Sequence, residues 1–256
     1  MDSTYSLLSA LKGQQRQMET ISNNLANINT PGFKKDQALF REYYNLAIGQ
    51  DLESEEEKFA HGEFISPYNR GSSSYAMLDS VSPQLHRGDL RVTDNPYDLA
   101  IQTDGYFVVD TVQGLRYTRN GQFLRDGQGY LITTNGDRIL GQKGPIKIEG
   151  QHFTVGSQGR ILVDRKEIDQ LRVVTFERPA GLTRMGNSYW APGGTDQKPI
   201  ASNNHVIQQG TIEMSNVDSI QELVKMITVN RSYQAAQRAI RSKDDLDSKS
   251  ISVAKL

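Results

Sequence analysis

The side chains that could carry acid–base or metal chemistry are scattered along the chain rather than grouped. No histidine occurs in HExxH or another spacing typical of metal ligands, so we expect the histidines at surface and turn positions. Several aspartates could meet in the folded chain, but Asp and Gly at such intervals more commonly build turns. The histidines are His61, His86, His152 and His205, and the aspartates are Asp94, Asp98, Asp104 and Asp110.

Two glycine pairs resemble the beginnings of known site motifs. Gly127-Gln128-Gly129 lacks the third glycine of a dinucleotide-binding loop. The run from Gly156 to Gly159 does not form the G-x-S-x-G pattern of a nucleophile elbow. We interpret both as turns. The sequence therefore predicts no catalytic, cofactor-binding or metal site, and we expect a protein that is not an enzyme.

Composition excludes further classes of protein. The chain has 256 residues, of which 36% are hydrophobic, enough for one sizeable domain or two small ones. It contains no cysteine, so disulfides and thiolate sites are absent, and a net charge of −1 gives no basic excess for nucleic acid. The first residues lack the basic start and apolar core of a secretory signal. Taken alone, this indicates a cytoplasmic protein, unless a dedicated apparatus exports uncleaved chains.

The elements that could position a functional surface lie at the two ends of the chain. A helix is predicted over residues 5–28, because apolar residues recur there at alternating intervals of four and three, with one polar member, Gln14. The breaker run from Asn29 to Gly32 ends this pattern. The predicted N-terminal seam consists of Leu7, Leu11, Met18, Ile21, Leu25 and Ile28.

A second helix is predicted from about Val217 to Val253, a stretch without Gly or Pro. Ser215 and Asn216 precede it and could cap its start. Apolar residues again recur at intervals of three and four. The predicted C-terminal seam consists of Met226, Val229, Tyr233, Ala236 and Ile240.

The middle of the chain has the pattern of short β-strands. Apolar and β-branched runs alternate with turn dipeptides, among them Asn120-Gly121 and Asn135-Gly136, and Asn-Gly is a strong hairpin signal. The predicted strands are 106–109, 115–119, 130–134, 145–149, 152–155, 161–164 and 171–176. The predicted fold class is α+β: long N- and C-terminal helices that pack together in a coiled-coil-like manner, with a central all-β domain.

Four regions follow from these patterns: an N-terminal helix (1–32), an extended connecting segment (33–84), a β domain (85–212) and a C-terminal helix (213–256). The acidic run Glu53–Glu57 is expected to be a solvated face or loop. The end helices could pair within one chain or partly with other subunits. Gln14 on the seam favours assembly, because a polar seam residue reduces stability and fixes register.

Three blocks of sequence resemble bacterial flagellar basal-body rod proteins. They follow the order of that family, at both ends and in the centre of the chain. The N-terminal block comprises Asn23, Asn24, Leu25, Ala26, Asn27, Gly32 and Phe33; the central block comprises Tyr117, Thr118, Arg119, Gly121 and Phe123; the C-terminal block comprises Ser215, Asn216 and Val217.

The resemblance implies a structural subunit of the rod, the axial shaft that transmits torque from motor to hook. It implies helices in an inner tube, a β-rich outer domain, and partners that are other rod proteins, copies of this chain and the flagellar export apparatus. It also implies export without a cleaved signal, no cofactor, no nucleic acid and no small-molecule substrate. Residues 96–101 are most similar to the proximal-rod member next to the distal rod. A distal-rod subunit and, as a different class, a β-fold binding module are the alternatives.

Overall fold

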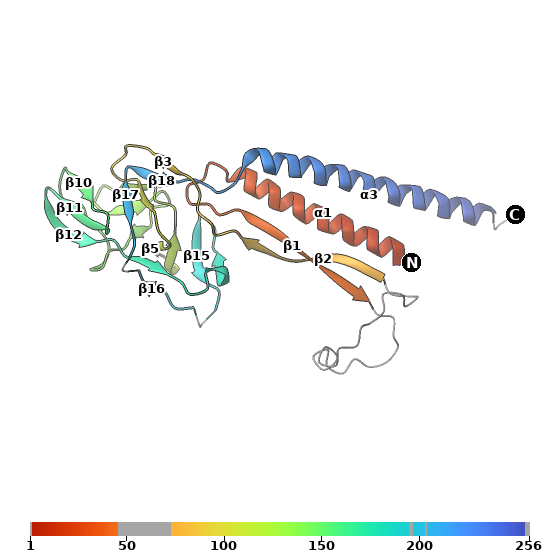
Figure 1. Ribbon diagram of the computed structural model, residues 1–256, viewed down its shortest axis with the longest axis horizontal. Coiled ribbons are helices and arrows are strands. Elements are labelled where there is room, and N and C mark those ends of the chain that lie inside the picture. The colour runs from red at the N-terminus through yellow and green to blue at the C-terminus, as the bar shows by residue number, and fades with distance from the viewer. Residues whose placement is uncertain (1, 46–72, 195–196, 203, 254–256) are drawn as a thin grey trace, which may run out of the picture. The chain divides into compact units, whose positions relative to one another are not determined.

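The computed structural model describes residues 2–45, 73–194, 197–202 and 204–253. It has an α+β architecture, with a helix toward each end of the chain and β-strands between them (Figure 1). Two compact units can be distinguished. The first lies within residues 1–21, 38–81 and 224–256, and the second comprises 22–37 and 82–223. The acidic run Glu53–Glu57 lies outside the described residues.

The two predicted helices are present with shifted ends. They are α1 (Asp2–Ala26) and α3 (Ser219–Val253). The prediction that α1 extends to Ile28 is wrong, because the chain turns at Asn27 ahead of the breaker run. The predicted cap of α3 is also wrong. Asp218 caps this helix, and its Oδ1 accepts hydrogen bonds from the backbone N–H groups of Ile220 (2.9 Å) and Gln221 (3.1 Å).

The second unit contains most of the strands. They are β3 (Leu90–Val92), β4 (Leu99–Ile101), β5 (Tyr106–Thr111), β6 (Gly114–Thr118), β7 (Phe123–Arg125), β8 (Leu131–Thr133), β9 (Arg138–Ile139), β10 (Phe153–Val155), β11 (Arg160–Val163), β12 (Lys166–Gln170), β13 (Val173–Thr175), β14 (Leu182–Arg184), β15 (Tyr189–Pro192), β16 (Ile200–Ala201), β17 (Ile207–Gln209) and β18 (Thr211–Glu213). A 3₁₀ turn, η2 (Pro179–Gly181), precedes β14.

The largest sheet has nine strands, and all pairings between its named strands are antiparallel. Its main path runs β14-β15-β6-β5-β9-β8-β7, and β13 pairs with both β5 and β16. A three-stranded sheet, β10-β11-β12, and the pairs β17–β4 and β18–β3 complete this unit. Through β18, the segment that precedes α3 is therefore hydrogen-bonded into the β-rich unit.

Three of the predicted turns have the expected form, and one of them, the run from Gly156 to Gly159, connects β10 to β11. Asn135-Gly136 connects β8 to β9, with Gly136 at φ +90°, and the run from Gly127 to Gly129 connects β7 to β8. The prediction of a hairpin at Asn120-Gly121 is wrong, because β6 pairs with β5 and β15 while β7 pairs with β8. Residues 145–149 form isolated bridges instead of the predicted strand.

Apolar side chains fill the β-rich unit in two clusters. The larger contains Phe107 and Phe123, whose rings meet edge to face at a centroid distance of 5.1 Å. The smaller gathers around Trp190, with Tyr117 and Phe176 in edge-to-face contact at 4.9 Å. Tyr117 and Phe123 of the central motif are thus core residues, and burial accounts for their apolar character.

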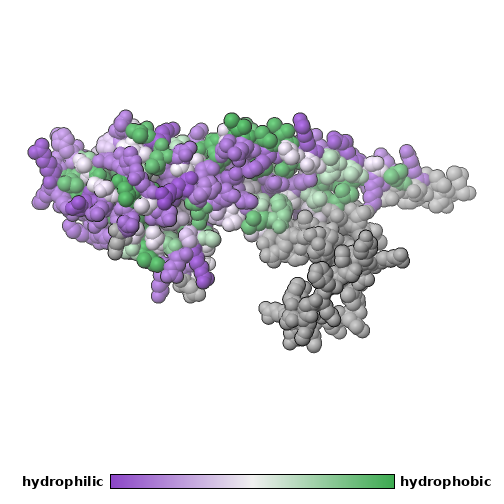
Figure 2. Space-filling view, viewed as in Figure 1, coloured by the Kyte–Doolittle hydropathy of each residue, from purple (hydrophilic) through white to green (hydrophobic). Residues whose placement is uncertain are grey.

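The first unit contains most of both helices and the ribbon formed by β1 (Asp36–Asn45) and β2 (Ser73–Pro83). Hydrophobic residues gather on the surface over the first turns of α3 (Figure 2). Within the described part of the chain, neither helix combines the length and the apolar character needed to span a membrane.

Candidate functional site: a buried ionic junction

Three charged side chains from distant parts of the chain meet inside the second unit. Lys34, Arg119 and Glu213, which we call the ionic junction, are 0%, 5% and 1% exposed. Lys34 Nζ lies 2.5 Å from Oε1 of Glu213, and Arg119 Nε lies 2.8 Å from Oε2. Both carboxylate oxygens are therefore paired with a cation in a site shielded from water.

The remaining donors of the ionic junction bind backbone carbonyls. Lys34 Nζ donates to the carbonyl of His86 at 2.8 Å. Arg119 donates through Nη1 to Gly105 (2.7 Å) and through Nη2 to the carbonyls of Ile101 (3.1 Å) and Thr103 (3.2 Å). Because buried charges are stable only when paired and hydrogen-bonded, these contacts bind the three segments together.

The environment changes the protonation of this group. Burial alone would raise the pKa of Glu213, but the charges of Arg119 and Lys34 and their hydrogen bonds outweigh it, so the pKa lies below its ordinary value. Burial lowers the pKa of Lys34, although its contact with Glu213 favours the charged form. Glu213 is thus held as a carboxylate, the form that the two cations require.

A second buried carboxylate ties the end of α1 to the start of α3. Glu222 accepts from Lys35 Nζ at 2.8 Å and from Asn24 Nδ2 at 3.2 Å. The side-chain amide of Asn24 also pairs with the backbone of Asp36, donating to its carbonyl (2.9 Å) and accepting from its N–H (2.8 Å). Asn24 therefore holds the chain where it leaves the first helix.

Asn216 connects the C-terminal motif to the segment that follows α1 and to the segment that precedes β3. Its Oδ1 accepts from the backbone N–H of Lys35 at 2.7 Å, and its Nδ2 donates to the carbonyls of Gln84 (2.8 Å) and His86 (2.9 Å). These bonds explain why Asn216 does not cap α3 as predicted. The Oγ of Ser215 accepts from the backbone N–H of Val217 at 3.3 Å.

Two glycines allow the backbones to approach each other around the ionic junction. Gly32 has φ +66°, and a Cβ there would lie 2.4 Å from the backbone N of Asn120. A Cβ on Gly88 would lie 2.0 Å from the carbonyl oxygen of Met214. No real Cβ tolerates such distances, so Gly is required where the N-terminal motif crosses the central one.

Arg184 stacks on two aromatic rings and also contacts residues 33–36. Arg184 has its guanidinium carbon 4.5 Å from the ring centre of Phe33 and 5.1 Å from that of Trp190. The same guanidinium forms an ion pair with Asp36 at 2.8 Å and donates to the carbonyl of Lys34. Burial raises the pKa of Asp36, and Arg184 opposes this effect.

The structure thus brings together part of the predicted family motif. Asn24, Gly32, Phe33, Arg119 and Asn216 all contribute to the contacts described above. Asn23 and Ala26 are exposed, and Leu25 and Asn27 are half-buried at the end of α1. Thr118 is buried and donates to the carbonyl of Ser188 at 3.0 Å.

The predicted seam residues are all at least half-buried, but residues outside the seams, such as Gly13, Asn24 and Glu222, are buried as well. Ile21 and Val229 are buried. The others are half-buried, namely Leu7, Leu11, Met18, Leu25, Ile28, Met226, Tyr233, Ala236 and Ile240. Gln14 is half-buried, and its buried side-chain oxygen has no hydrogen-bond partner among the described residues. The assignment of these residues to an assembly interface stays a prediction.

Several of the charged residues in this region were not predicted from the sequence. Glu213, Asp36 and Arg184 were not singled out. The available signal was weak: Glu213 is a lone acid after Thr211-Ile212 in a short β-like run. A charge inside an apolar run suggests a buried partner but does not identify it.

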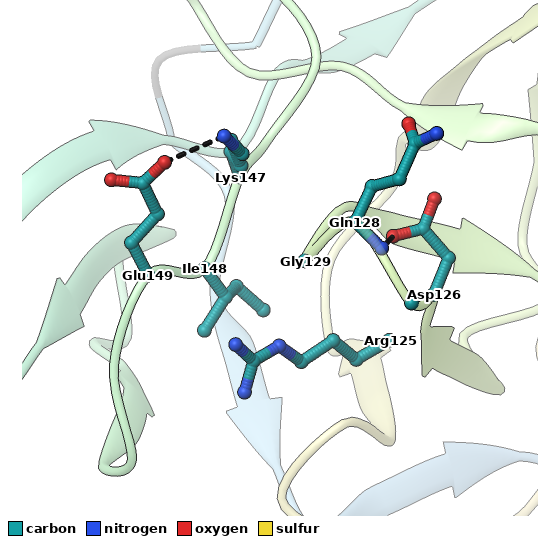
Figure 3. A pocket seen from close by; sticks show the side chains of 8 residues that line it. Arg125, Asp126, Gln128, Gly129, Lys147, Ile148 and Glu149 are labelled. Atoms are coloured by element: carbon teal, nitrogen blue, oxygen red, sulfur yellow. Dashed lines mark hydrogen bonds and ion pairs between the residues drawn. The ribbon is translucent and has the colours of Figure 1, made fainter.

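Two polar hollows lie elsewhere in the second unit. One, of about 430 Å³, is lined by the β7–β8 turn and by residues 147–149 (Figure 3). Lys147 lies 2.6 Å from Glu149, Asp126 accepts from the backbone N–H of Gln128, and Arg125 donates to the carbonyl of Gly150 at 3.1 Å. The other hollow, of about 390 Å³, brings Asn23 and Asn27 beside Asn120. In the described ranges, no group of three His, Asp or Glu side chains is placed to hold a metal.

Family models match three separate segments of the chain. The basal-body rod protein model matches residues 5–34, the D1 domain model of the flagellar hook protein FlgE/F/G matches 100–163, and the C-terminal model of the basal-body rod FlgEFG proteins matches 208–253. Lys34, Arg119 and Glu213 fall one in each segment. The ionic junction is therefore the point where the three matched segments meet.

Curated relatives are similar over nearly the whole length. The chain is 31% identical to the flagellar basal-body rod protein FlgG of Bacillus subtilis, with 95% of this chain and 96% of the relative covered. It is 29% identical to the basal-body rod protein FlgF of Mesorhizobium japonicum, with 94% and 92% covered. It is 30% identical to the flagellar hook-basal body complex protein FlhO of B. subtilis, with 94% and 93% covered.

Proposed function

Because the chain belongs to the flagellar basal-body rod protein family and is a structural rod subunit, we propose that it assembles with copies of itself and with other rod proteins into the axial shaft of the flagellum. In this role the shaft carries torque from the motor to the hook. The protein acts through packing rather than catalysis. It reaches the basal body through the flagellar export apparatus, without a cleaved signal.

The observation that carries this proposal is the ionic junction. Lys34 follows α1, Glu213 precedes α3, and Arg119 lies in the β domain between them. A mechanical force applied to either terminal segment of the second unit acts on the buried ion pairs of Glu213, which lie at 2.5 Å from Lys34 and 2.8 Å from Arg119. Removing either partner of such a pair is strongly destabilising, because it leaves a buried charge uncompensated. The three segments must therefore stay together for the second unit to remain folded.

The predicted seams supply the assembly contacts in this proposal. Each half-buried seam residue, such as Leu11 or Met18, has apolar surface left for a neighbouring subunit to cover. Full burial of such a side chain contributes roughly 1.5–3 kcal/mol relative to full exposure. Coiled-coil-like pairing of the end helices, within or between subunits, would align these residues. Contacts between different patches on successive copies then generate a helical tube.

Within the rod, we assign the chain to the proximal segment next to the distal rod, on the similarity of residues 96–101. A distal-rod position is the alternative. The ratio of this chain to its relatives in purified basal bodies distinguishes the two, because a minority species fits the proximal segment and a dominant one fits the distal rod.

The proposal is tested by Leu11→Asp, with Leu8→Asp as the matched control. Leu8 lies on the same helix but is 55% exposed. In a strain that lacks the wild-type chain, Leu11→Asp protein should be made and folded but missing from basal bodies, while Leu8→Asp protein should enter them. Normal incorporation of Leu11→Asp protein would contradict the assembly role of the seam.

A further inference from the structure

The dipeptide Asn-Gly occurs at two places in this chain, residues 120–121 and 135–136. Asn-Gly is prone to spontaneous loss of its side-chain amide, because glycine has no side chain to keep its backbone nitrogen away from the asparagine Cγ. Both asparagines line the polar hollow of about 390 Å³, so water reaches both. The two sites therefore differ in how firmly the fold holds the reacting atoms.

The backbone at Asn120 is fixed by close packing. Gly121 is buried, and a Cβ there would lie 1.6 Å from the carbonyl oxygen of Leu99. The carbonyl of Gly121 also accepts from the backbone N–H of Leu99 at 2.9 Å. Oδ1 of Asn120 accepts from the backbone N–H of Gln122 at 3.0 Å. Attack of the Gly121 nitrogen on the Asn120 side chain requires both groups to rotate, and these contacts oppose that rotation.

The second site lies on the exposed turn between β8 and β9. Asn135 and Gly136 are both exposed, and a Cβ on Gly136 would have no atom within 4 Å. The Asn135 side chain is held by one long hydrogen bond, from Nδ2 to the hydroxyl of Tyr189 at 3.3 Å. The backbone N–H of Gly136 donates to the carbonyl of Thr133 at 3.0 Å. This bond must open before reaction, and bonds at exposed turns open readily.

We propose that Asn135 deamidates spontaneously in the folded protein, whereas the fold protects Asn120. The Gly136 nitrogen loses its proton to hydroxide and attacks Cγ of Asn135. A C–N bond forms, the Cγ–Nδ2 bond breaks, and the leaving nitrogen takes a proton from water and departs as ammonia. Water then opens the succinimide ring at either carbonyl, which gives aspartate or isoaspartate. The net reaction consumes one water and releases one ammonia, and it does not depend on the proposed function.

Either product weakens the β8–β9 turn. The new carboxylate cannot donate to Tyr189, whose hydroxyl already donates to Asp137 at 2.7 Å, so two negative charges then face one hydroxyl. Isoaspartate also adds a methylene to the main chain inside both rings that close the turn, Gly136 N–H to Thr133 (3.0 Å) and Thr133 N–H to Asp137 (2.8 Å). Because β9 pairs with both β5 and β8, this damage loosens β7 and β8 from the rest of the nine-stranded sheet.

Peptide mapping of aged protein locates the reaction. The purified full chain is incubated at mildly alkaline pH, digested and analysed by mass spectrometry at intervals. The peptide with Asn135 should gain the mass that replaces NH₂ by OH at least about tenfold faster than the peptide with Asn120. In urea the two rates should converge, because the fold no longer holds either site. Equal or faster reaction at Asn120 in the folded protein, or an equally large difference in urea, would overturn the inference.

Asn135→Gln tests the consequence for the fold. Glutamine keeps the side-chain amide but reacts far more slowly, because the attack must close a six-membered ring. After ageing, the wild type should melt at a lower midpoint and Asn135→Gln protein at an unchanged one. Fresh Asn135→Asp protein, which carries the product charge from the start, should melt below fresh wild type. If aged Asn135→Gln protein loses as much as the wild type, or if deamidated wild type melts like fresh protein, the assigned damage to the turn is wrong.

Discussion

Glu213 and Arg119 are separated by 94 positions in the sequence, and their side chains meet at 2.8 Å inside the β-rich unit. Lys34 lies 85 positions before Arg119 in the sequence and is the second cation paired with the carboxylate of Glu213. No single segment of the chain can form this group. The ionic junction therefore forms only when the segment after α1, the β domain and β18 have folded together.

Replacing Glu213 with Gln should destabilise the protein by about 3 kcal/mol, because two buried cations lose their counter-charge. The change is nearly isosteric, so packing is little affected. Chemical denaturation monitored by Trp190 fluorescence measures the effect. Glu167→Gln, at an exposed position in β12, is the control and should change stability by less than about 0.5 kcal/mol. Equal stability of the two variants would show that the ionic junction contributes little.

The effect of Glu213→Gln should depend on pH. The folded-state pKa of Glu213 lies below its ordinary value of 4.5, so its stabilising contribution is complete above the unfolded-state pKa and is lost as the pH falls through the folded-state pKa. The stability difference between wild type and Glu213→Gln should stay constant from pH 8 to about 6 and shrink below about 4.5. A difference that grows on acidification would contradict the assigned direction.

Gly32→Ala should destabilise the protein by about 3 kcal/mol or more, because it combines a left-handed backbone with a Cβ 2.4 Å from the Asn120 amide. Gly186→Ala is the matched control, since Gly186 has a similar φ of +79° but no atom within 4 Å of a Cβ. The control should lose only about 1 kcal/mol. Thermal melts of both variants check the difference, and equal losses would mean that the close approach is easily relaxed.

A fragment of residues 85–217 should be more stable than one of 85–212. The shorter fragment lacks Glu213 and leaves the buried Arg119 without its carboxylate, whereas the longer one keeps that pair and the end of β18. Hydrogen bonds to charged groups contribute roughly 1.5–3 kcal/mol, so we expect a difference of about 2 kcal/mol in urea denaturation. Identical denaturation midpoints would argue that the carboxylate is dispensable for the β domain.

The helices were predictable because their signal is local. Apolar residues three and four apart, such as Leu7 and Leu11, specify a helical face without reference to the rest of the chain. The turn at Asn135-Gly136 was predictable for the same reason, since two adjacent residues determine it.

The incorrect hairpin at Asn120-Gly121 shows the limit of local signals. Gly121 is needed because a Cβ there would lie 1.6 Å from the carbonyl oxygen of Leu99, and Asn120 accepts from the backbone N–H of Gln122 at 3.0 Å. The residues serve a crossing of distant segments instead of a turn between neighbouring strands. Sequence spacing does not distinguish the two uses.

The ionic junction could not be assembled from the sequence for a related reason. Lys34 and Glu213 have no periodic relation to each other, and most lysines and glutamates of a soluble domain are exposed. The hydrogen bond from the backbone N–H of Gly32 to the carbonyl of Glu213, at 2.8 Å, and the pairing of β18 with β3 bring their segments together. The resemblance identified the three segments, and the fold explains why they belong together.

Quantitative mass spectrometry of purified hook–basal bodies tests whether this chain is a subunit of the flagellar rod. Peptides of this chain should be present in the purified structures at a fixed ratio to the other rod proteins, and they should be lost when Leu11→Asp replaces the wild type. If the wild-type chain were absent from intact hook–basal bodies, it would not be a rod subunit.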